Sequence, residues 1–291
     1  MKKLVSSVLV LCMIAVALAG CGNKSTETTK ATEATASTES AVSTEAVSET
    51  QAAEGEAATV QVYIAASLSN AMDEISANYK SVQPNVDLVF NAGSSGKLQT
   101  QIEEGGACDV FFSAATKQMN ALVEGGYVQE ADVTDLLENK VQLIKPAGTE
   151  TKVTGFENIT DAANLALAAD TVPVGQYARE IFDNLGITDQ IMAMEINECE
   201  DVSAVLAAVS EGSNEVGIVY ATDAASVADK VDVIATANDT ELKSKVIYPV
   251  GPVKNTEADD AEVAAAKAFV DYLKTPEAEA VFEKYGFSCI N

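Results

Sequence analysis

Short apolar segments alternate with amphipathic segments along most of the chain, from about Thr59 onward. The apolar segments are rich in Val, Ile and Phe, which is typical of buried strands. The amphipathic segments carry apolar residues at helical spacing, as in Leu68, Met72 and Ile75. Because strands that alternate with helices form parallel sheets covered by helices, the pattern predicts an α/β fold. The expected strands are 60–66, 86–90, 109–115, 141–146, 165–168, 191–196, 217–220, 231–235 and 246–253.

The strand expected at 141–146 divides this pattern into two similar halves. It leads into a second series of strands and helices, and the strand at 246–253 leads back to the first series. The chain from Thr59 onward is long enough for two small lobes. We therefore expect two lobes, each a mainly parallel sheet flanked by helices. Lobe one is expected to comprise residues 59–141 and 247–291, and lobe two residues 142–246.

Serine and glycine occupy several of the turns that lead from a strand into a helix. Gly93-Ser94-Ser95-Gly96 follows one expected strand, and Ser67 follows another. A helix begins with unpaired backbone N–H groups and a partial positive charge, so its start favours an anion. Serine is also a good N-cap residue, so each turn taken alone fits an ordinary helix start. Ligands bind at the carboxyl ends of parallel strands, and the repetition of such turns in both halves favours a site between them.

The N-terminal segment differs from the rest of the chain. Two lysines at positions 2 and 3 precede an apolar run over residues 4–19, which ends in Leu-Ala-Gly before Cys21. This run is shorter than the roughly 20 residues of a membrane span and is typical of a secretory signal. The residues around Cys21 resemble a bacterial lipobox. We therefore expect residues 1–20 to be a lipoprotein signal peptide, and a lipid on Cys21 to anchor the protein to the outer face of the cell membrane.

Residues 22–58 consist mainly of Ser, Thr, Ala and Glu and show no apolar periodicity. Such a segment buries too little apolar surface to offset the entropy lost on folding. We expect residues 21–58 to be a disordered tether that begins at the lipidated cysteine.

The chain is acidic, with 18 Lys and Arg against 44 Asp and Glu and a formal net charge of −26. Loss of the two lysines with the signal peptide would leave −28. This charge disfavours nucleic acid and anionic membrane surfaces as partners. The absence of His removes most zinc sites and every triad with a histidine base. The remaining cysteines, Cys108, Cys199 and Cys289, are odd in number and imply no disulfide framework, although a single Cys108–Cys289 bridge stays open.

Seven short motifs follow one another in order over residues 59–291. They are Ala65-Ala66-Ser67-Leu68, Gly93-Ser94-Ser95-Gly96-Lys97-Leu98, Asp109-Val110-Phe111-Phe112-Ser113-Ala114, Val172-Pro173-Val174-Gly175-Gln176-Tyr177-Ala178, Glu200-Asp201-Val202, Gly217-Ile218-Val219-Tyr220 and Tyr285-Gly286-Phe287. In their order and spacing they resemble the molybdate-binding proteins of bacterial molybdate ABC importers.

The resemblance implies a two-lobe periplasmic binding protein fold of type II, with the ligand in the interlobe cleft. That family holds its oxyanion without charged side chains. Carried over by position, Ser67 and Ser95 would each offer a hydroxyl and a backbone N–H. Val174 and Val202 would offer backbone N–H groups, and Tyr220 a phenol O–H.

The resemblance also implies a role in transport rather than catalysis. The expected partners are the permease and ATPase subunits of a molybdate importer, and the binding protein itself is expected to be a monomer. No cofactor is expected, and no residue is expected to ligate a metal directly, because the metal arrives inside molybdate or tungstate.

The chemistry of the ligand agrees with this assignment of donors. Molybdate is a fully ionised dianion at neutral pH, whereas phosphate keeps a proton and needs an acceptor, so a site of donors alone favours molybdate. Each hydrogen bond to a charged group contributes about 1.5–3 kcal/mol, so five contribute about 7.5–15 kcal/mol against the ~8 kcal/mol of micromolar binding. We interpret Lys97 and Arg179, near these turns, as solvated helix faces. Asp201 is expected to support a helix start.

Two alternatives remain open. The chain could bind another oxyanion such as sulfate, or a small organic anion, in the same kind of cleft. It could also be an enzyme that uses Ser67, Ser95 or a cysteine as a nucleophile, with a lysine in place of the missing histidine base. Molybdate and tungstate have nearly the same size and charge, so the residues do not separate them.

Overall fold

The computed structural model describes residues 57–290 of the chain. The expected signal peptide, the lipidated Cys21 and nearly all of the expected tether lie outside the described residues. Within the described part, no helix has both the length and the apolar character needed to cross a membrane.

Lobe one is built on six strands. They are β1 (Ala58–Ala65), β2 (Val86–Gly93), β3 (Val110–Phe112), β4 (Thr134–Asn139), β10 (Val246–Pro252) and β11 (Ser288–Cys289). Their order in the sheet is β11-β4-β10-β3-β1-β2. β1 pairs in parallel with β2 and β3, whereas β10 runs antiparallel to β3 and β4, and β11 antiparallel to β4.

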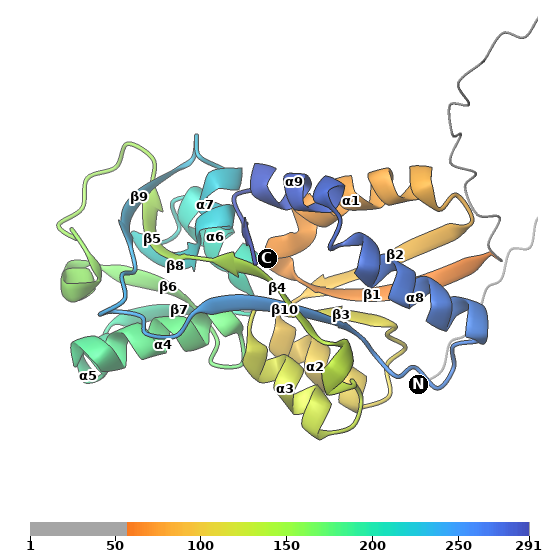
Figure 1. Ribbon diagram of the computed structural model, residues 1–291. Coiled ribbons are helices and arrows are strands. Elements are labelled where there is room, and N and C mark those ends of the chain that lie inside the picture. The colour runs from red at the N-terminus through yellow and green to blue at the C-terminus, as the bar shows by residue number, and fades with distance from the viewer. Residues whose placement is uncertain (1–56, 291) are drawn as a thin grey trace, which may run out of the picture. The chain divides into compact units, whose positions relative to one another are not determined.

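Helices cover both faces of this sheet (Figure 1). One face carries α1 (Ser69–Val82), α8 (Asp260–Tyr272) and α9 (Pro276–Lys284), and the other carries α2 (Ser95–Glu103) and α3 (Thr116–Glu124). Short 3-10 helices, η1 (Ala66–Leu68) and η2 (Glu130–Asp132), precede α1 and β4. The apolar stripe predicted for the first helix is buried, including Leu68, Met72 and Ile75. This burial holds the start of α1 against the end of β1.

Lobe two is built on five strands. They are β5 (Val141–Pro146), β6 (Asn164–Ala168), β7 (Glu195–Cys199), β8 (Val216–Tyr220) and β9 (Val231–Thr236), in the order β7-β6-β8-β5-β9. β6 pairs in parallel with β7 and β8, and β5 runs antiparallel to β8 and β9. The helices are η3 (Phe156–Asp161), α4 (Pro173–Leu185), α5 (Thr188–Ile191), α6 (Val202–Ser210) and α7 (Ala221–Ser226). α4 and α5 lie below this sheet and α6 and α7 above it in Figure 1.

The chain passes between the two sheets twice. β4 ends at Asn139 and β5 begins at Val141, so Lys140 alone joins them, and residues 237–245 return the chain from β9 to β10. One hydrophobic cluster contains buried residues of both lobes, and a smaller one lies beneath α2 and α3. The lobes therefore share a packed core beside the two crossing strands.

The predicted two-lobe α/β architecture is confirmed, with corrections. Both sheets are mixed rather than mainly parallel, because the strands that cross between lobes run antiparallel to their neighbours. The strand expected at 191–196 begins only at Glu195, since Ile191 ends α5. The sheets also divide the chain slightly differently: Ala58 already pairs in β1, Val141 pairs in lobe two and Val246 pairs in lobe one. β4 and β11 were not predicted.

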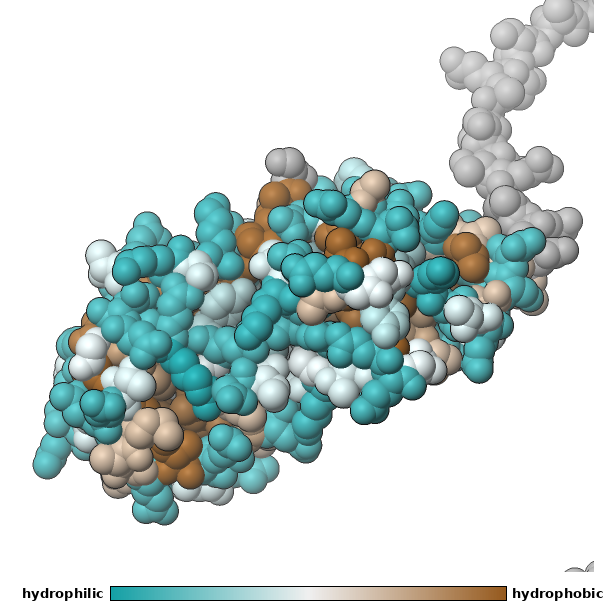
Figure 2. Space-filling model, turned by 90° about the horizontal axis from the view of Figure 1, so that it is seen from below, coloured by the Kyte–Doolittle hydropathy of each residue, from teal (hydrophilic) through white to brown (hydrophobic). Residues whose placement is uncertain are grey.

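The surface seen in Figure 2 is mainly hydrophilic, with apolar side chains in separate groups. The large apolar side chains that are exposed come from different elements, which is ordinary for a protein surface. They are Val82, Val89, Met192, Val233, Val263 and Ile290.

Candidate functional site

A small cavity lies where strand ends of lobe one meet helix starts of lobe two. Lobe one lines it with Ala65, Ala66, Ser67, Gly93, Ser94, Ser95 and Ala114, and lobe two with Val172, Pro173, Asp201, Val202 and Tyr220. Even when the open solvent at its mouth is counted, the space left by protein atoms is only ≈200 Å³. Sites for drug-sized ligands occupy about 300–1,000 Å³. The cavity therefore suits a ligand of few atoms.

The structure brings four of the five predicted site residues to this cavity. Ser67, Ser95, Val202 and Tyr220 line it, and Val174 does not. α4 begins at Pro173, with Val172 as its N-cap. Proline has no N–H, so the first N–H group of this helix belongs to Val174, one residue beyond the lining. The role predicted for Val174 depends on whether that group reaches a ligand.

Ser95 is the first residue of α2, and only 1% of it is exposed. Ser94 is the N-cap, and its Oγ accepts a hydrogen bond from the Lys97 N–H at 3.3 Å. The Ser95 Oγ accepts one from the Ala114 N–H at 3.0 Å. Because a backbone N–H can only donate, this bond uses a lone pair of Ser95 and leaves its hydroxyl hydrogen available to a ligand. Ser94 thus serves the helix, and Ser95 keeps a hydroxyl hydrogen that it can donate.

Ser67 lies in η1, directly after β1, and its Oγ is 2.9 Å from the Tyr248 Oη. Tyr248 belongs to β10 and is fully buried. It also accepts a hydrogen bond from Asn139 Nδ2 at 3.2 Å. Neither Tyr248 nor Asn139 was predicted as a site residue. A tyrosine within a strand that is otherwise buried and apolar is the signal that could have marked Tyr248, since a buried phenol usually has a partner.

Tyr220 ends β8 and is the N-cap residue of α7, and 1% of it is exposed. Its hydroxyl has no hydrogen-bond partner among the described residues. A buried polar group without a partner costs about 1–3 kcal/mol, so such groups need an explanation. Burial raises the pKa of Tyr220 well above its usual value of 10, so the phenol keeps its proton. A neutral O–H at the cavity wall is a donor that lacks an acceptor.

The start of α6 gives the cavity a backbone donor and an acidic neighbour. Asp201 is the N-cap, and its Oδ1 accepts a hydrogen bond from the Ala204 N–H at 2.9 Å, as expected of a residue that supports a helix start. The Val202 N–H lies one residue into the helix, where no intrahelical acceptor exists. Asp201 also lines the cavity, so a carboxylate that serves the helix start borders the predicted donors.

The two cationic residues near the turns have different surroundings. Lys97 forms an ion pair with Glu200 of lobe two at 2.6 Å, with both side chains largely exposed. Arg179 is not a solvated residue, because its Nη1 donates to the carbonyls of Ala168 and Gly175 at 2.9 and 2.8 Å and ties β6 to α4. Neither residue lines the cavity.

Other reactive groups lie elsewhere. Cys108, Cys199 and Cys289 are free, so the disulfide left open by the sequence is not formed. Burial raises the pKa of each of these thiols, that of Cys289 to about 11, which makes them poor nucleophiles. In the described residues, no group of three or more Cys, Asp or Glu is placed to hold a metal ion.

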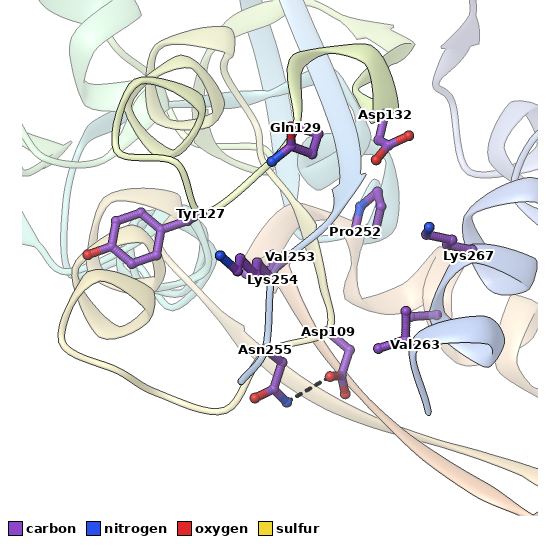
Figure 3. A pocket seen from close by; sticks show the side chains of 11 residues that line it. Asp109, Tyr127, Gln129, Asp132, Pro252, Val253, Lys254, Asn255, Val263 and Lys267 are labelled. Atoms are coloured by element: carbon purple, nitrogen blue, oxygen red, sulfur yellow. Dashed lines mark hydrogen bonds between the residues drawn. The ribbon is translucent and has the colours of Figure 1, made fainter. Parts of the chain in front are cut away.

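A larger pocket lies on lobe one, away from the cleft (Figure 3). Its buried carboxylate, Asp109, is already satisfied, since it accepts from the Gln61 N–H at 2.7 Å and from Asn255 Nδ2 at 2.8 Å. The pocket therefore has no buried polar group that waits for a ligand. The unpartnered Tyr220 hydroxyl distinguishes the interlobe cavity from it.

Residues 60–288 match the family model of bacterial extracellular solute-binding proteins. The chain belongs to this family. It is 37% identical over 231 residues to the putative ABC transporter substrate-binding lipoprotein YvgL of Bacillus subtilis, covering 79% of this chain and 86% of that protein. It is 36% identical over 237 residues to the molybdate-binding protein ModA of Escherichia coli, with 79% and 88% covered.

A solved structure agrees with these relatives. The substrate-binding domain of a putative molybdenum ABC transporter from Clostridium difficile is 34% identical and has a TM-score of 0.61, with 81% of this chain and all of that chain covered. The resemblance indicated by the seven motifs is thereby confirmed, as is the two-lobe binding-protein fold. The relatives are solute-binding components of transporters.

Proposed function

We propose that this protein captures molybdate or tungstate between its two lobes and delivers the anion to an ABC importer. Relatives that are more than 30% identical are named for molybdate or molybdenum transport, and they cover most of this chain. The observation in this chain that carries the proposal is the buried Tyr220 hydroxyl, a donor without a partner at the cavity wall. An oxyanion oxygen supplies the acceptor that the protein does not.

The remaining predicted donors extend this picture. Ser67 and Ser95 each carry a hydroxyl at the cavity, and Val202 carries a backbone N–H at a helix start. Val174 provides a further N–H if the anion reaches the start of α4. Hydrogen bonds to a charged acceptor are about twice as strong as neutral ones, so four or five of them support tight binding without a cation. The small cavity favours a tetrahedral ion over an organic ligand.

Isothermal titration calorimetry of residues 57–291 with molybdate, tungstate, sulfate and phosphate tests the proposal. We expect heat of binding with the first two anions, at micromolar or lower dissociation constants. Absence of heat with both would overturn the proposal. Tighter binding of sulfate than of molybdate would instead select the alternative of a binding protein for another oxyanion.

We also propose where the protein is located and what it works with. We place the protein outside the cytoplasm, as a monomer held at the cell membrane by a lipid on Cys21, with a permease and an ATPase as partners and no enzyme activity of its own. The name of the Bacillus relative supports the lipoprotein assignment. Incorporation of radiolabelled palmitate into the full chain, and its loss in Cys21→Ala, is the expected result, and equal labelling of both proteins would contradict it.

A further inference from the structure

Among residues 57–290, no backbone N–H donates to the Ser67 hydroxyl, unlike that of Ser95. The Ser67 Oγ contacts the Tyr248 Oη at 2.9 Å, and either oxygen could be the donor in that bond. Which one donates decides what Ser67 offers the ligand. If Tyr248 donates, the hydroxyl hydrogen of Ser67 is available to an anion. If Ser67 donates, its oxygen presents only a lone pair to the cavity.

The answer follows from a chain of hydrogen bonds that begins at the crossing between the lobes. The Lys140 N–H donates to Asn139 Oδ1 at 2.8 Å, and a backbone N–H can only donate. This bond identifies the other atom of the amide as Nδ2, which has only hydrogens to offer. Nδ2 donates to Thr222 Oγ1 at 2.9 Å and to Tyr248 Oη at 3.2 Å. The orientation of the Asn139 amide is thus determined by the backbone.

Tyr248 therefore accepts a hydrogen bond from Asn139 and must donate its own hydroxyl hydrogen to another acceptor. Burial raises the pKa of Tyr248 well above its usual value of 10, so the phenol is not ionised. Within hydrogen-bond geometry its hydroxyl meets Asn139, which only donates, and Ser67. The Tyr220 hydroxyl also interacts with it but lies outside hydrogen-bond geometry. Tyr248 therefore donates a hydrogen bond to Ser67 Oγ. The hydroxyl hydrogen of Ser67 is then directed away from Tyr248.

We infer that Asn139 and Tyr248 form a relay that sets the polarity of Ser67, so that its hydroxyl donates to a bound oxyanion. Each group donates a hydrogen bond to the next one: the Lys140 N–H to Asn139, Asn139 to Tyr248, and Tyr248 to Ser67. Asn139 and Tyr248 are positioning residues, because they act through Ser67. Both are buried, with 6% and 0% exposed, so water does not compete for these bonds. The inference rests on the proposed function, and it names what makes one of the proposed donors a donor.

Reversal of the relay tests this inference. In Asn139→Asp the ionised carboxylate accepts a hydrogen bond from Tyr248, Tyr248 then accepts from Ser67, and Ser67 presents a lone pair to the anion. The new charge also repels the anion by itself. A double-mutant cycle with Ser67→Ala separates the two effects, because only the reversal requires the serine hydroxyl. Titration calorimetry at about pH 8 is run with whichever of the four oxyanions binds the wild-type protein most tightly.

We expect Asn139→Asp to weaken binding at least roughly tenfold more in the wild-type background than in the Ser67→Ala background, since an unpaired acceptor would face an anion. Tyr248→Phe removes the donor to Ser67 and should likewise weaken binding with Ser67 present and much less without it. Tyr127→Phe, which removes an exposed hydroxyl bound to the Glu103 carbonyl, is the matched control and should leave binding unchanged.

The pH dependence of binding affinity gives a second measurement, which a general loss of structure would not change in the predicted way. Once protonated, the carboxyl group introduced by Asn139→Asp donates as the amide does. Lowering the pH should therefore restore part of the affinity of this variant, and only when Ser67 is present. Asp223, whose pKa is raised by burial to about 7, also titrates near this network, whereas burial keeps Tyr177 and Tyr220 protonated, so the wild-type profile is the baseline. Thermal unfolding of each variant shows that it is folded.

The outcomes are distinct. Equal losses in both serine backgrounds would overturn the relay and leave the proposed function intact. Coupling measured with sulfate as the tightest ligand would support the relay and contradict the proposed function. A wild-type protein that binds none of the four anions would overturn both.

Discussion

The two walls of the cavity offer hydrogen bonds by different means. Lobe one contributes the hydroxyls of Ser67 and Ser95, and each is oriented by a further hydrogen bond, from Tyr248 and from the Ala114 N–H. Lobe two contributes backbone N–H groups at helix starts, such as that of Val202, together with the Tyr220 phenol. A backbone donor is placed by the helix and does not depend on its side chain. The two walls should therefore respond differently to the same substitution.

Among single substitutions in the lobe-one wall, Ser95→Ala should weaken anion binding the most. It removes one bond to the anion and leaves the buried Ala114 N–H without its acceptor, so we expect binding to weaken by about 1.5–3 kcal/mol and the fold to lose about 1–3 kcal/mol. Calorimetry and urea unfolding measure the two losses separately. Unchanged affinity would show that Ser95 is only part of a helix start.

Val202→Ala is the matched change in the lobe-two wall. It keeps the N–H group, so we expect little loss of affinity even though a buried side chain is shortened. Val202→Pro deletes the N–H at a helix position where proline is tolerated, and it should weaken binding by about 1.5–3 kcal/mol. If alanine proves as costly as proline, the backbone is not the donor.

Gly96→Ala tests how closely the two walls approach each other. A Cβ on Gly96 would overlap the carbonyl oxygen of Thr171 in lobe two. We expect the lobes to be held apart, at a cost to binding of about 1–3 kcal/mol. Stability of the fold should not fall, because alanine favours helix over glycine. Calorimetry and small-angle scattering measure the change. Gly251→Ala, whose Cβ would meet only ordinary contacts, is the control.

Asp223→Asn tests the buried carboxyl behind Tyr220. The Asp223 carboxylate oxygen accepts the Tyr220 N–H at 3.0 Å, and burial raises its pKa to about 7. The folded protein thus holds this proton more tightly than the unfolded chain. The stability it contributes is complete below pH 3.8 and is lost as the pH rises through about 7. We expect the wild-type protein to lose more unfolding free energy than Asp223→Asn between about pH 5 and 8, measured by urea unfolding. Equal losses would contradict the assignment.

Of these substitutions, Lys97→Ala should have the smallest effect on the affinity for the anion. The Lys97–Glu200 ion pair joins the two lobes at the edge of the cleft, but both side chains are largely exposed. Exposed ion pairs contribute about 0–1 kcal/mol and are screened by salt. We expect a loss of affinity below about 1 kcal/mol in calorimetry, and a smaller one at high salt. A loss as large as that of Ser95→Ala would mean that the site uses a cation.

The elements predicted with success and those missed differ in a physical way. β1 and α1 have apolar residues at the period of their own geometry, and β8 is a continuous buried run, so all three were predictable from local pattern. β4, with the sequence Thr-Asp-Leu-Leu-Glu-Asn, lacks such a pattern. Its pairing with β10, more than 100 residues later in the chain, makes it a strand. Arg179 was misread for the same reason, since its carbonyl partners are set by how α4 packs on β6.

The amino-acid sequence by itself determined the alternation of strands and helices, the turns that carry Ser67, Ser95, Val202 and Tyr220, and the family, because these depend on residue types at short spacing. Only the tertiary structure decided that these four line one cavity, that Asp201 joins them while Val174 stays just outside, and that the Tyr220 hydroxyl has no hydrogen-bond partner in the described part of the chain. It also placed Asn139, Tyr248 and Ser67 in successive hydrogen-bond contact, from which the direction of the relay is inferred. Hydrogen-bond direction depends on which groups meet across distant parts of the chain, and no local pattern records that.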